Sequence, residues 1–492
     1  MRTPFFNGFR FGIRKHFYII LLFVLLAFLI ICPFYSTHWV IGISDFSFHF
    51  SQLEEMYDNA KAGHWFTFIA THTFNHVGAG NFLFYPTLFF YPWVLLRFFL
   101  DPISAFYIWI GLMLFFGSLI SYFCMYAFCK SRLQAFIFAC LYLILPYTLK
   151  NALSIKVLGQ FLGALFLPLV FLGLYHVLFE NQKRFFSLAF GIAALIYCHI
   201  LTTFMAGEFI IGLLIFRWLV YGMPKKRWWA LIKSFLVAGL LSLPVIINFA
   251  FDFIGKKVVS VSSLTKNRLL SVTYLGDFIT QSLSNINFIG LILIVFALGG
   301  YFFVRRQRGY RTIYLLGLIS LVLSTSIFPW FMLRNSFLAS IQFTYRYTVF
   351  AGLFFSIVGS WVITNKLFSF KHLPSKWFLL PLVGLVALVS VYATFNGEDL
   401  KLLNYPHQPQ NKSHILKKAS QKNIQQPVNK KQPLKKIPKK LVPFPDAQLI
   451  NKKNYHNIFS YQVKYGSSDY FPRAAFKNAD SILANRFYKD RS

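Results

Sequence analysis

The sequence predicts an all-α protein that crosses a membrane many times. Of its 492 residues, 57% are hydrophobic and 20% are aromatic, and the mean hydropathy is +0.55. A soluble domain cannot bury that much apolar surface, and many windows approach the ~20 apolar residues needed to cross a bilayer. Because backbone exposed to lipid must satisfy its own hydrogen bonds, we expect these windows to form helices.

Basic residues in short loops predict the topology. Arg2, Arg10, Arg14 and Lys15 precede the first apolar window, which places the N-terminus in the cytoplasm. Other short basic loops lie near residues 130, 184, 226, 306 and 371. If all of them are cytoplasmic, two crossings separate each from the next. About eleven spans result, approximately at 17–34, 104–128, 133–149, 158–179, 185–203, 205–221, 229–249, 288–304, 312–328, 345–363 and 377–395. The chain would then be a multi-pass cell-membrane protein with an extracellular C-terminus.

One apolar segment, 82–100, does not fit this alternation. It contains Pro86, Pro92 and Arg97, and counting it as a crossing would invert every later loop. We therefore expect a re-entrant or interfacial helix on the outer face. The membrane domain would comprise residues 1–395, with large outer loops at 35–102 and 251–287.

The remaining residues form a basic tail that the topology places outside. Residues 396–445 are rich in Lys, Gln, Asn and Pro, which predicts a disordered linker. Such a linker could contact anionic lipid headgroups or wall polymers, or it could be a solvated spacer. In either case it would not meet nucleic acid, although the whole chain carries a formal charge of +34. Aromatic residues return in 446–492, which predicts a small extracellular segment that docks on the outer loops.

Several function classes find no support. The short cytoplasmic loops contain no P-loop and no dinucleotide fingerprint, which argues against an ATP-driven pump. The five cysteines lie in or beside apolar windows, and we interpret them as buried side chains rather than a redox pair. His72 and His76 have a metal-ligand spacing only if they lie on a helix, and no helix signal supports one. We expect no metal and no cofactor.

The most informative motif follows the first span. From Asp45 the chain is typical of an amphipathic helix, with Phe46, Phe50 and Leu53 on one stripe, and such a helix should lie in the interface plane. Asp45 and His49 are one turn apart and could act together on the protons of one ligand. Alternatively, Ser44 or Asp45 is a helix N-cap and His49 a polar residue that faces the headgroups.

Other polar residues gather near predicted outer span ends. Lys156, Arg334 and Arg346, with Gln342 near the last of them, could hold a lipid phosphate, or the three cations could extend toward lipid headgroups. His199 and Glu208 fall inside or at the ends of adjoining spans, where ionisable groups are functional hypotheses. The alternative for this pair is an interfacial position exposed to water.

Together, these motifs resemble the GT-C glycosyltransferase superfamily. They resemble more closely the bacterial membrane proteins called "6-pyruvoyl-tetrahydropterin synthase-related", near the YfhO-type proteins, and not the soluble pterin enzyme. The similar stretches are Asp45 to His49, Gly80-Asn81 to Tyr85-Pro86, Tyr142 to Tyr147, His199 to Thr202, Gln342 to Arg346, and Ser468 to Pro472. The chain departs from the family where Gln52 replaces a frequent Arg, Thr344 replaces a Pro, and Gln160 replaces a common acid.

The resemblance implies an inverting transferase that uses a polyprenyl-phosphate-linked sugar at the outer face. The acceptor would be a cell-surface glycan, lipid or wall polymer. Asp45 would be the general base or would position the acceptor, and Arg346, with Lys156, would stabilise the departing lipid phosphate. Asn81 and Tyr85 are further candidates from the shared motifs. The alternatives are a transporter or flippase of a lipid-linked saccharide, which predicts a continuous polar path and inverted repeats, and a non-catalytic membrane scaffold.

Overall fold

The computed structural model describes residues 4–42, 45–76, 78–254, 271–333, 335–367, 379–395 and 448–460. Residues 255–270 of the predicted second outer loop, Arg334, the linker 396–445 and residues 461–492 lie outside the described part. Predictions for these segments, including contacts of the basic tail with anionic lipids or polymers, therefore stay predictions.

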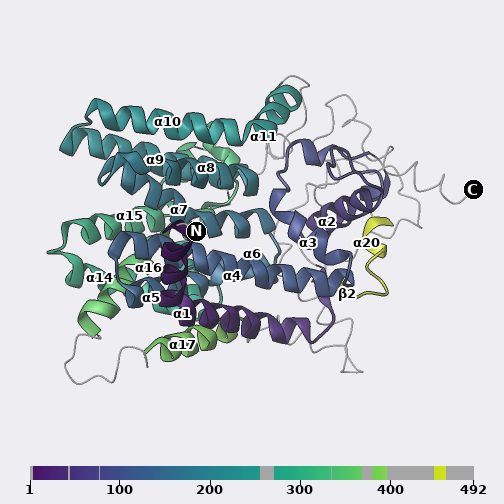
Figure 1. The fold of residues 1–492 in the computed structure, drawn as a ribbon, viewed down its shortest axis with the longest axis horizontal. Coiled ribbons are helices and arrows are strands. Elements are labelled where there is room, and N and C mark those ends of the chain that lie inside the picture. Colours follow the sequence, from purple (N-terminus) through teal and green to yellow (C-terminus); the bar gives the residue numbers. More distant parts are fainter. Residues whose placement is uncertain are drawn as a thin grey trace, which may run out of the picture.

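The described chain is a helical bundle with a smaller lobe at one end (Figure 1). The bundle consists of α1 (Pro4–Tyr35), α4 (Pro102–Cys129), α5 (Arg132–Leu143), α6 (Pro146–Leu153), α7 (Leu158–Leu178), α8 (Phe186–Cys198), α9 (Ile200–Tyr221), α10 (Lys225–Leu241), α11 (Leu243–Asn248), α13 (Leu275–Leu283), α14 (Gly290–Val304), α15 (Arg308–Ser324), α16 (Thr348–Val362) and α17 (Leu379–Phe395). Short turns η4 (Gln182–Arg184), η6 (Trp330–Leu333), η7 (Phe337–Ile341), η8 (Thr344–Tyr347) and the π-turns η5 (Phe249–Ile254) and η9 (Ile363–Leu367) connect them.

Five helices are long and apolar enough to cross a membrane, and two bent helix pairs raise that number to seven among the described residues. The pairs are α5 with α6, bent by 54°, and α10 with α11, bent by 74°. The other four predicted spans coincide with α8, α14, α15 and α17, which have 13 to 17 residues. An all-α membrane protein is confirmed, whereas the number eleven stays a prediction.

Local sequence explains where the helices begin. Asp101 caps α4, accepting hydrogen bonds from the backbone N–H groups of Ile103 and Ser104 at 3.1 Å, with Pro102 at the first helical position. Ser131 caps α5 in the same way through the backbone N–H of Gln134. The chain reverses between these two helices, so α4 and α5 lie antiparallel.

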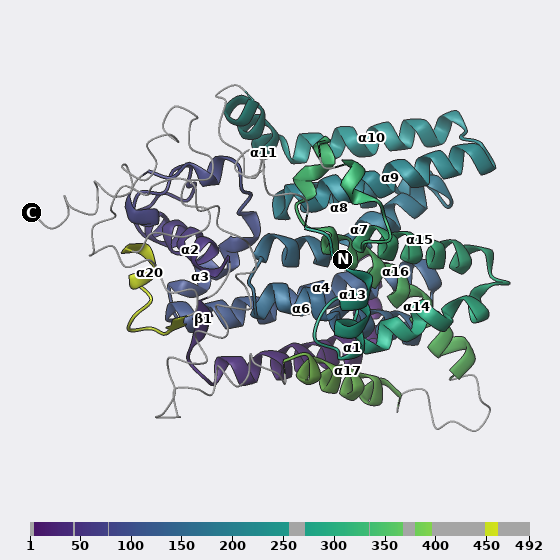
Figure 2. The same cartoon turned by 180° about the vertical axis from the view of Figure 1, so that it is seen from behind.

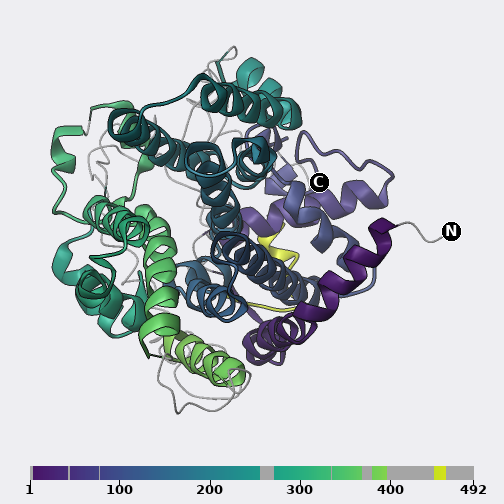
Figure 3. The same cartoon turned by 60° about the vertical axis from the view of Figure 1, so that its left-hand side comes forward.

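Helix α7 lies in the centre of the bundle, between α4 and α8 (Figure 3). A Cβ atom added at Gly173 would lie 2.7 Å from the backbone carbon of Ser187, and one added at Gly191 would lie 2.9 Å from the backbone N of Val170. Small residues at these positions let the backbones of α7 and α8 approach closely, as in many membrane bundles. The later helices α14, α15 and α16 pack together on another side, in green in Figure 3.

We call the smaller part the first-loop lobe. It contains β1 (Val40–Gly42), α2 (Phe46–Lys61), η1 (Phe74–His76), η2 (Asn81–Leu83), η3 (Leu88–Phe90), α3 (Tyr91–Arg97), β2 (Gln448–Ile450) and α20 (Asn457–Ser460). Strands β1 and β2 pair antiparallel, with Val40 opposite Ile450. The C-terminal piece 448–460 therefore lies on the lobe, next to α2 and α3 (Figure 2). Residues 82–100 form only short helices, none long enough to cross a membrane.

The expected solvent-facing acidic side of α2 is only partly seen, because Glu54 and Glu55 are buried; the position of α2 in an interface plane stays a prediction. Glu54 accepts a hydrogen bond from Arg97 Nε at 2.9 Å. Glu55 accepts the backbone N–H groups of Thr71 at 2.7 Å and Thr73 at 2.8 Å. These partners make burial of the acidic face possible, since buried carboxylates need hydrogen bonds or opposite charges.

Candidate functional site

His49 lies in the first turn of α2 and is 2% exposed. Burial lowers its pKa to about 4, against a smaller opposing effect of its hydrogen bond with Gln52, so the ring is neutral at pH 7. The Nδ1 atom lies 3.1 Å from Gln52 Oε1, and Nε2 lies 3.5 Å from the Tyr85 hydroxyl oxygen. Because the amide oxygen can only accept, the assigned proton is on Nδ1, which leaves Nε2 as an acceptor that faces Tyr85.

Tyr85 connects this histidine to the helical bundle. Its backbone N–H donates to Asn81 O at 2.8 Å, which closes the turn after η2. The Tyr85 ring centroid lies 5.2 Å from that of His49 and 6.4 Å from that of His199. A Cβ atom added at Gly159, in the first turn of α7, would collide with the Tyr85 hydroxyl and lie 2.8 Å from His199 Cδ2. Glycine at 159 therefore permits this meeting of lobe and bundle.

His199 separates α8 from α9 and caps α9. Its Nδ1 atom accepts the Thr202 backbone N–H at 3.2 Å and lies 2.8 Å from the Thr202 hydroxyl oxygen. The neutral ring therefore carries its proton on Nε2. His199 interacts electrostatically with both Arg346 and His49, so these three residues belong to one cluster.

Arg346 lies in η8, immediately before α16, and is half-buried. Its Nη1 atom donates to Ile341 O at 2.7 Å, and its guanidinium carbon lies 5.1 Å from the centroid of the Phe343 ring. With the Gln160 amide oriented to satisfy its neighbours, the amide oxygen accepts from Arg346 Nε at 2.7 Å and the nitrogen donates to the Tyr147 hydroxyl. Among the described residues, no ion pair involves Arg346. The neutral Gln160 orients the guanidinium without cancelling its charge.

Asp45 stands at the N-cap position of α2, half-buried, and its side chain makes no capping hydrogen bond. Its backbone oxygen accepts the His49 N–H at 3.0 Å. Both Asp45 and Arg346 interact electrostatically with Tyr345, whose ring centroid lies 6.0 Å from that of Tyr147. The alternative that Asp45 serves as a side-chain N-cap is therefore not supported, and the carboxylate lies on the Arg346 side of the lobe.

Lys156 is buried and lies between the lobe and the loop before α7. Its Nζ atom donates to Ile41 O at 2.7 Å and Ser154 O at 2.8 Å, and lies 5.7 Å from the centroid of the Phe46 ring. These contacts tie the lysine to strand β1 and to the start of α2, the segment that contains Asp45. Lys156 therefore helps to position that segment.

Gln342 precedes η8 in the chain, and Glu208 contacts η8 from α9. Gln342 adopts a positive φ of 63°, and its backbone oxygen accepts the Ser271 N–H at 2.7 Å. A positive φ at a non-glycine residue costs energy and is typical of constrained functional segments. Glu208 lies nine residues after His199 on α9, about 13 Å along the axis, and accepts the Tyr347 hydroxyl at 2.6 Å. It contacts the residue after Arg346, not His199.

Asn81 is almost fully buried, at 1% exposed. Neither its amide nitrogen nor its amide oxygen has a hydrogen-bond partner among the described side chains and backbone. A buried amide of this kind normally pairs with a polar group.

The structure thus brings His49, Tyr85, His199 and Arg346 into one cluster, with Asp45 at its edge. Sequence reasoning did not find Gly159, since a single glycine in an apolar window has no distinctive signal. It noted Gln160 only as a departure from a family pattern. The Glu54–Arg97 ion pair could have been found, because a lone arginine in an apolar segment requires an acidic partner.

Comparison with known proteins gives one family match. A family model described as the 6-pyruvoyl-tetrahydropterin synthase related domain of a membrane protein matches residues 82–395, more than half of the chain. This match confirms the family resemblance that the motifs suggested. A search of curated proteins finds no match.

Proposed function

The chain belongs to the 6-pyruvoyl-tetrahydropterin synthase related family of membrane proteins, and from the cluster around Arg346 we propose that it is a GT-C-type membrane glycosyltransferase. It transfers a sugar from a polyprenyl-phosphate donor to a cell-surface glycan, lipid or wall polymer. The bundle would cross the cell membrane about eleven times, with the N-terminus in the cytoplasm. The cluster and the C-terminus then face outside.

The observation that carries this proposal is the guanidinium of Arg346. Gln160 and Ile341 O fix its orientation without neutralising it. A planar guanidinium forms paired, charge-assisted hydrogen bonds with phosphate oxygens. It can therefore hold the phosphate of a lipid-linked donor and stabilise the negative charge that develops when the lipid phosphate departs.

The acidic partner in the proposed reaction is Asp45. The acceptor hydroxyl passes its proton to the Asp45 carboxylate while its oxygen forms a bond to the anomeric carbon. The bond from that carbon to the phosphate oxygen breaks, and its electron pair leaves with the polyprenyl phosphate. One displacement of this kind inverts the anomeric centre. Arg346 balances the charge of the leaving group, so the residues present need no metal for this step.

The neutral polar groups around Tyr85 support binding of a sugar. His49 Nε2 is an acceptor, the Tyr85 hydroxyl is both donor and acceptor, and the Asn81 amide has donors and an acceptor without partners among the described protein groups. Sugar hydroxyls satisfy such groups. A transporter would need a continuous polar path through the bundle. The bundle instead contains a cavity with an apolar lining, which does not favour such a path.

The test is a comparison of cell-surface glycans in a strain that lacks the gene. The strain receives the native gene, Asp45→Ala, Asp45→Asn, or the control Asp277→Asn, which changes an exposed acid on α13. Membrane levels of all variants are matched. We expect the native gene and the control to restore a missing sugar and both Asp45 variants to fail. Full restoration by Asp45→Ala would refute the acid–base role and favour a transporter or a scaffold.

A further inference from the structure

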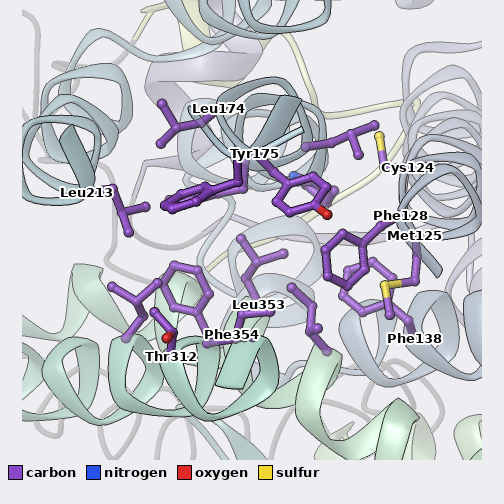
Figure 4. A pocket seen from close by; sticks show the side chains of 18 of the residues that line it. Cys124, Met125, Phe128, Phe138, Leu174, Tyr175, Leu213, Thr312, Leu353 and Phe354 are labelled. Atoms are coloured by element: carbon purple, nitrogen blue, oxygen red, sulfur yellow. The ribbon is translucent and has the colours of Figure 1, made fainter. Parts of the chain in front are cut away.

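A second feature lies within the bundle. A cavity of about 230 Å³ opens there between α4, α7, α9, α15 and α16. Figure 4 shows lining side chains, among them Tyr175 of α7 and Leu353 and Phe354 of α16, on different sides of this space. Its lining is almost entirely apolar and aromatic, and includes Phe128, Phe171, Tyr175, Leu213, Leu353 and Phe354.

The cavity is separate from the proposed transferase site. On α7 its lining runs from Pro168 to Tyr175, so its nearest residue lies eight residues, or about 12 Å along the helix, from Gln160, which contacts Arg346. The cavity lining includes Phe128, Phe179 and Arg308, each of which lies at or within a few residues of a short basic loop. The proposed reaction has no role for it.

A hydrocarbon chain is the ligand that fits this lining. Engineered apolar cavities of about 150 Å³ stay dry and bind benzene, so this larger cavity offers a poor site for water and a good one for several methylene groups. The bundle is a membrane protein, and acyl chains are the surrounding solvent at this depth. A chain that comes from the bilayer gains nothing from leaving water, so its binding here rests on packing against the aromatic lining.

The entrance of the cavity is positively charged. Arg308 lines it, is exposed, and forms no ion pair among the described residues. It begins α15, whose first turn has no acidic residue and whose N-cap residue, Gln307, makes no side-chain cap. The N-terminus of a helix carries a partial positive charge, which disfavours the guanidinium of Arg308 there by itself. An anion bound between Arg308 and the helix N-terminus would offset both charges. The neighbouring basic loops add to the attraction for anionic headgroups.

We propose that this cavity binds an anionic phospholipid, with one acyl chain between α7 and α16 and the headgroup phosphate against Arg308. The lipid comes from the leaflet next to the short basic loops. It would be a resident lipid and not the donor of the transferase reaction, because the cavity begins about 12 Å along α7 from Gln160 and no residue of the Arg346 cluster lines it.

The experiment uses the full-length protein in lipid nanodiscs that contain phosphatidylcholine with a small fraction of phosphatidylglycerol carrying a photoreactive acyl chain. Crosslinked peptides are mapped by mass spectrometry. Native protein should crosslink at cavity-lining residues. Leu213→Trp, which narrows the cavity, should lower this crosslinking several-fold, because the indole takes the space of part of the acyl chain. The control Ile211→Trp changes an exposed residue on the same helix and should leave it unchanged.

The headgroup is tested with a matched pair of charge variants. Arg308→Gln should lower the preference for phosphatidylglycerol over phosphatidylcholine about fivefold. Arg306→Gln, an exposed residue of the same loop that does not line the cavity, should change the preference less. Equal crosslinking in Leu213→Trp and Ile211→Trp proteins, or displacement of the probe by polyprenyl phosphate before unlabelled phosphatidylglycerol, would overturn the proposal. Neither result bears on transfer at the Arg346 cluster.

Discussion

Gly159→Ala is the sharpest test of how the lobe meets the bundle. The new Cβ would collide with the Tyr85 hydroxyl and lie 2.8 Å from His199 Cδ2. Overpacking of this kind costs about 1–3 kcal/mol, and the better helix propensity of alanine returns up to about 1 kcal/mol. We expect a net loss of up to about 2 kcal/mol in the free energy of unfolding. Because Tyr85 or His199 must move, transfer should fall about a hundredfold, the cost of a 1 Å misplacement in an active site.

The assay measures thermal unfolding in one detergent together with restoration of the cell-surface glycan. Gly207→Ala is the control, since nothing lies within 4 Å of an added Cβ at that position on α9. In the Gly159→Ala background, Tyr85→Phe removes the oxygen that the new methyl meets, so the double variant should be more stable than the sum of the single changes predicts. A Gly159→Ala protein as stable and as active as Gly207→Ala would refute the packing argument, as would strict additivity of the two changes.

Two further predictions concern the lobe, and a third concerns the contact between α9 and η8 in the bundle. Burial raises the pKa of Glu54 from 4.5 to about 7 despite the neighbouring Arg97. The folded lobe therefore binds a proton more tightly than the unfolded chain, and the Glu54 contribution to stability is present below pH 4.5 and lost as the pH rises through 7. Glu54→Gln should remove this slope from the unfolding midpoint, and an unchanged slope would contradict it. Phe459→Ala, which removes a ring stacked 6.3 Å from Phe50, should cost about 3–5 kcal/mol locally and speed proteolysis of the lobe; an unchanged cleavage rate would count against docking of 448–460. Tyr347→Phe should destabilise the protein by about 1–3 kcal/mol because Glu208 loses its 2.6 Å donor, whereas Tyr345→Phe should cost less in the same melting experiment.

Hydrophobic windows predicted the helices of the bundle because span length and apolar content are local properties. They did not predict the bends after α5 and α10, although Pro146 and Pro244 lie inside the two windows and each begins a new helix segment. The count of spans from such windows is therefore less certain than their helical nature. The amphipathic pattern that begins at Asp45 correctly indicated the start of α2.

The burial of α2 could not be read from its own residues. Its acidic face is covered by Arg97, 43 residues away, and its apolar stripe by Phe459, about 400 residues away. A helical pattern states which residues share a face, but not which distant segment covers that face. The same holds for the cluster, where Asp45, His49 and Arg346 were candidates from their motifs. Gly159, which faces Tyr85 and His199, and Gln160, which contacts Arg346, emerged only from the packing of α7.

The most direct test of the proposed site is binding of a fluorescent polyprenyl phosphate to the purified protein. The account predicts that Arg346→Gln weakens binding between about tenfold and a hundredfold, the range for hydrogen bonds to a charged group. Asp45→Asn, which removes a negative charge from the edge of the cluster, should bind the lipid phosphate at least as tightly as the native protein while transferring no sugar. Native affinity in Arg346→Gln would contradict the account, because the guanidinium would then not hold the phosphate.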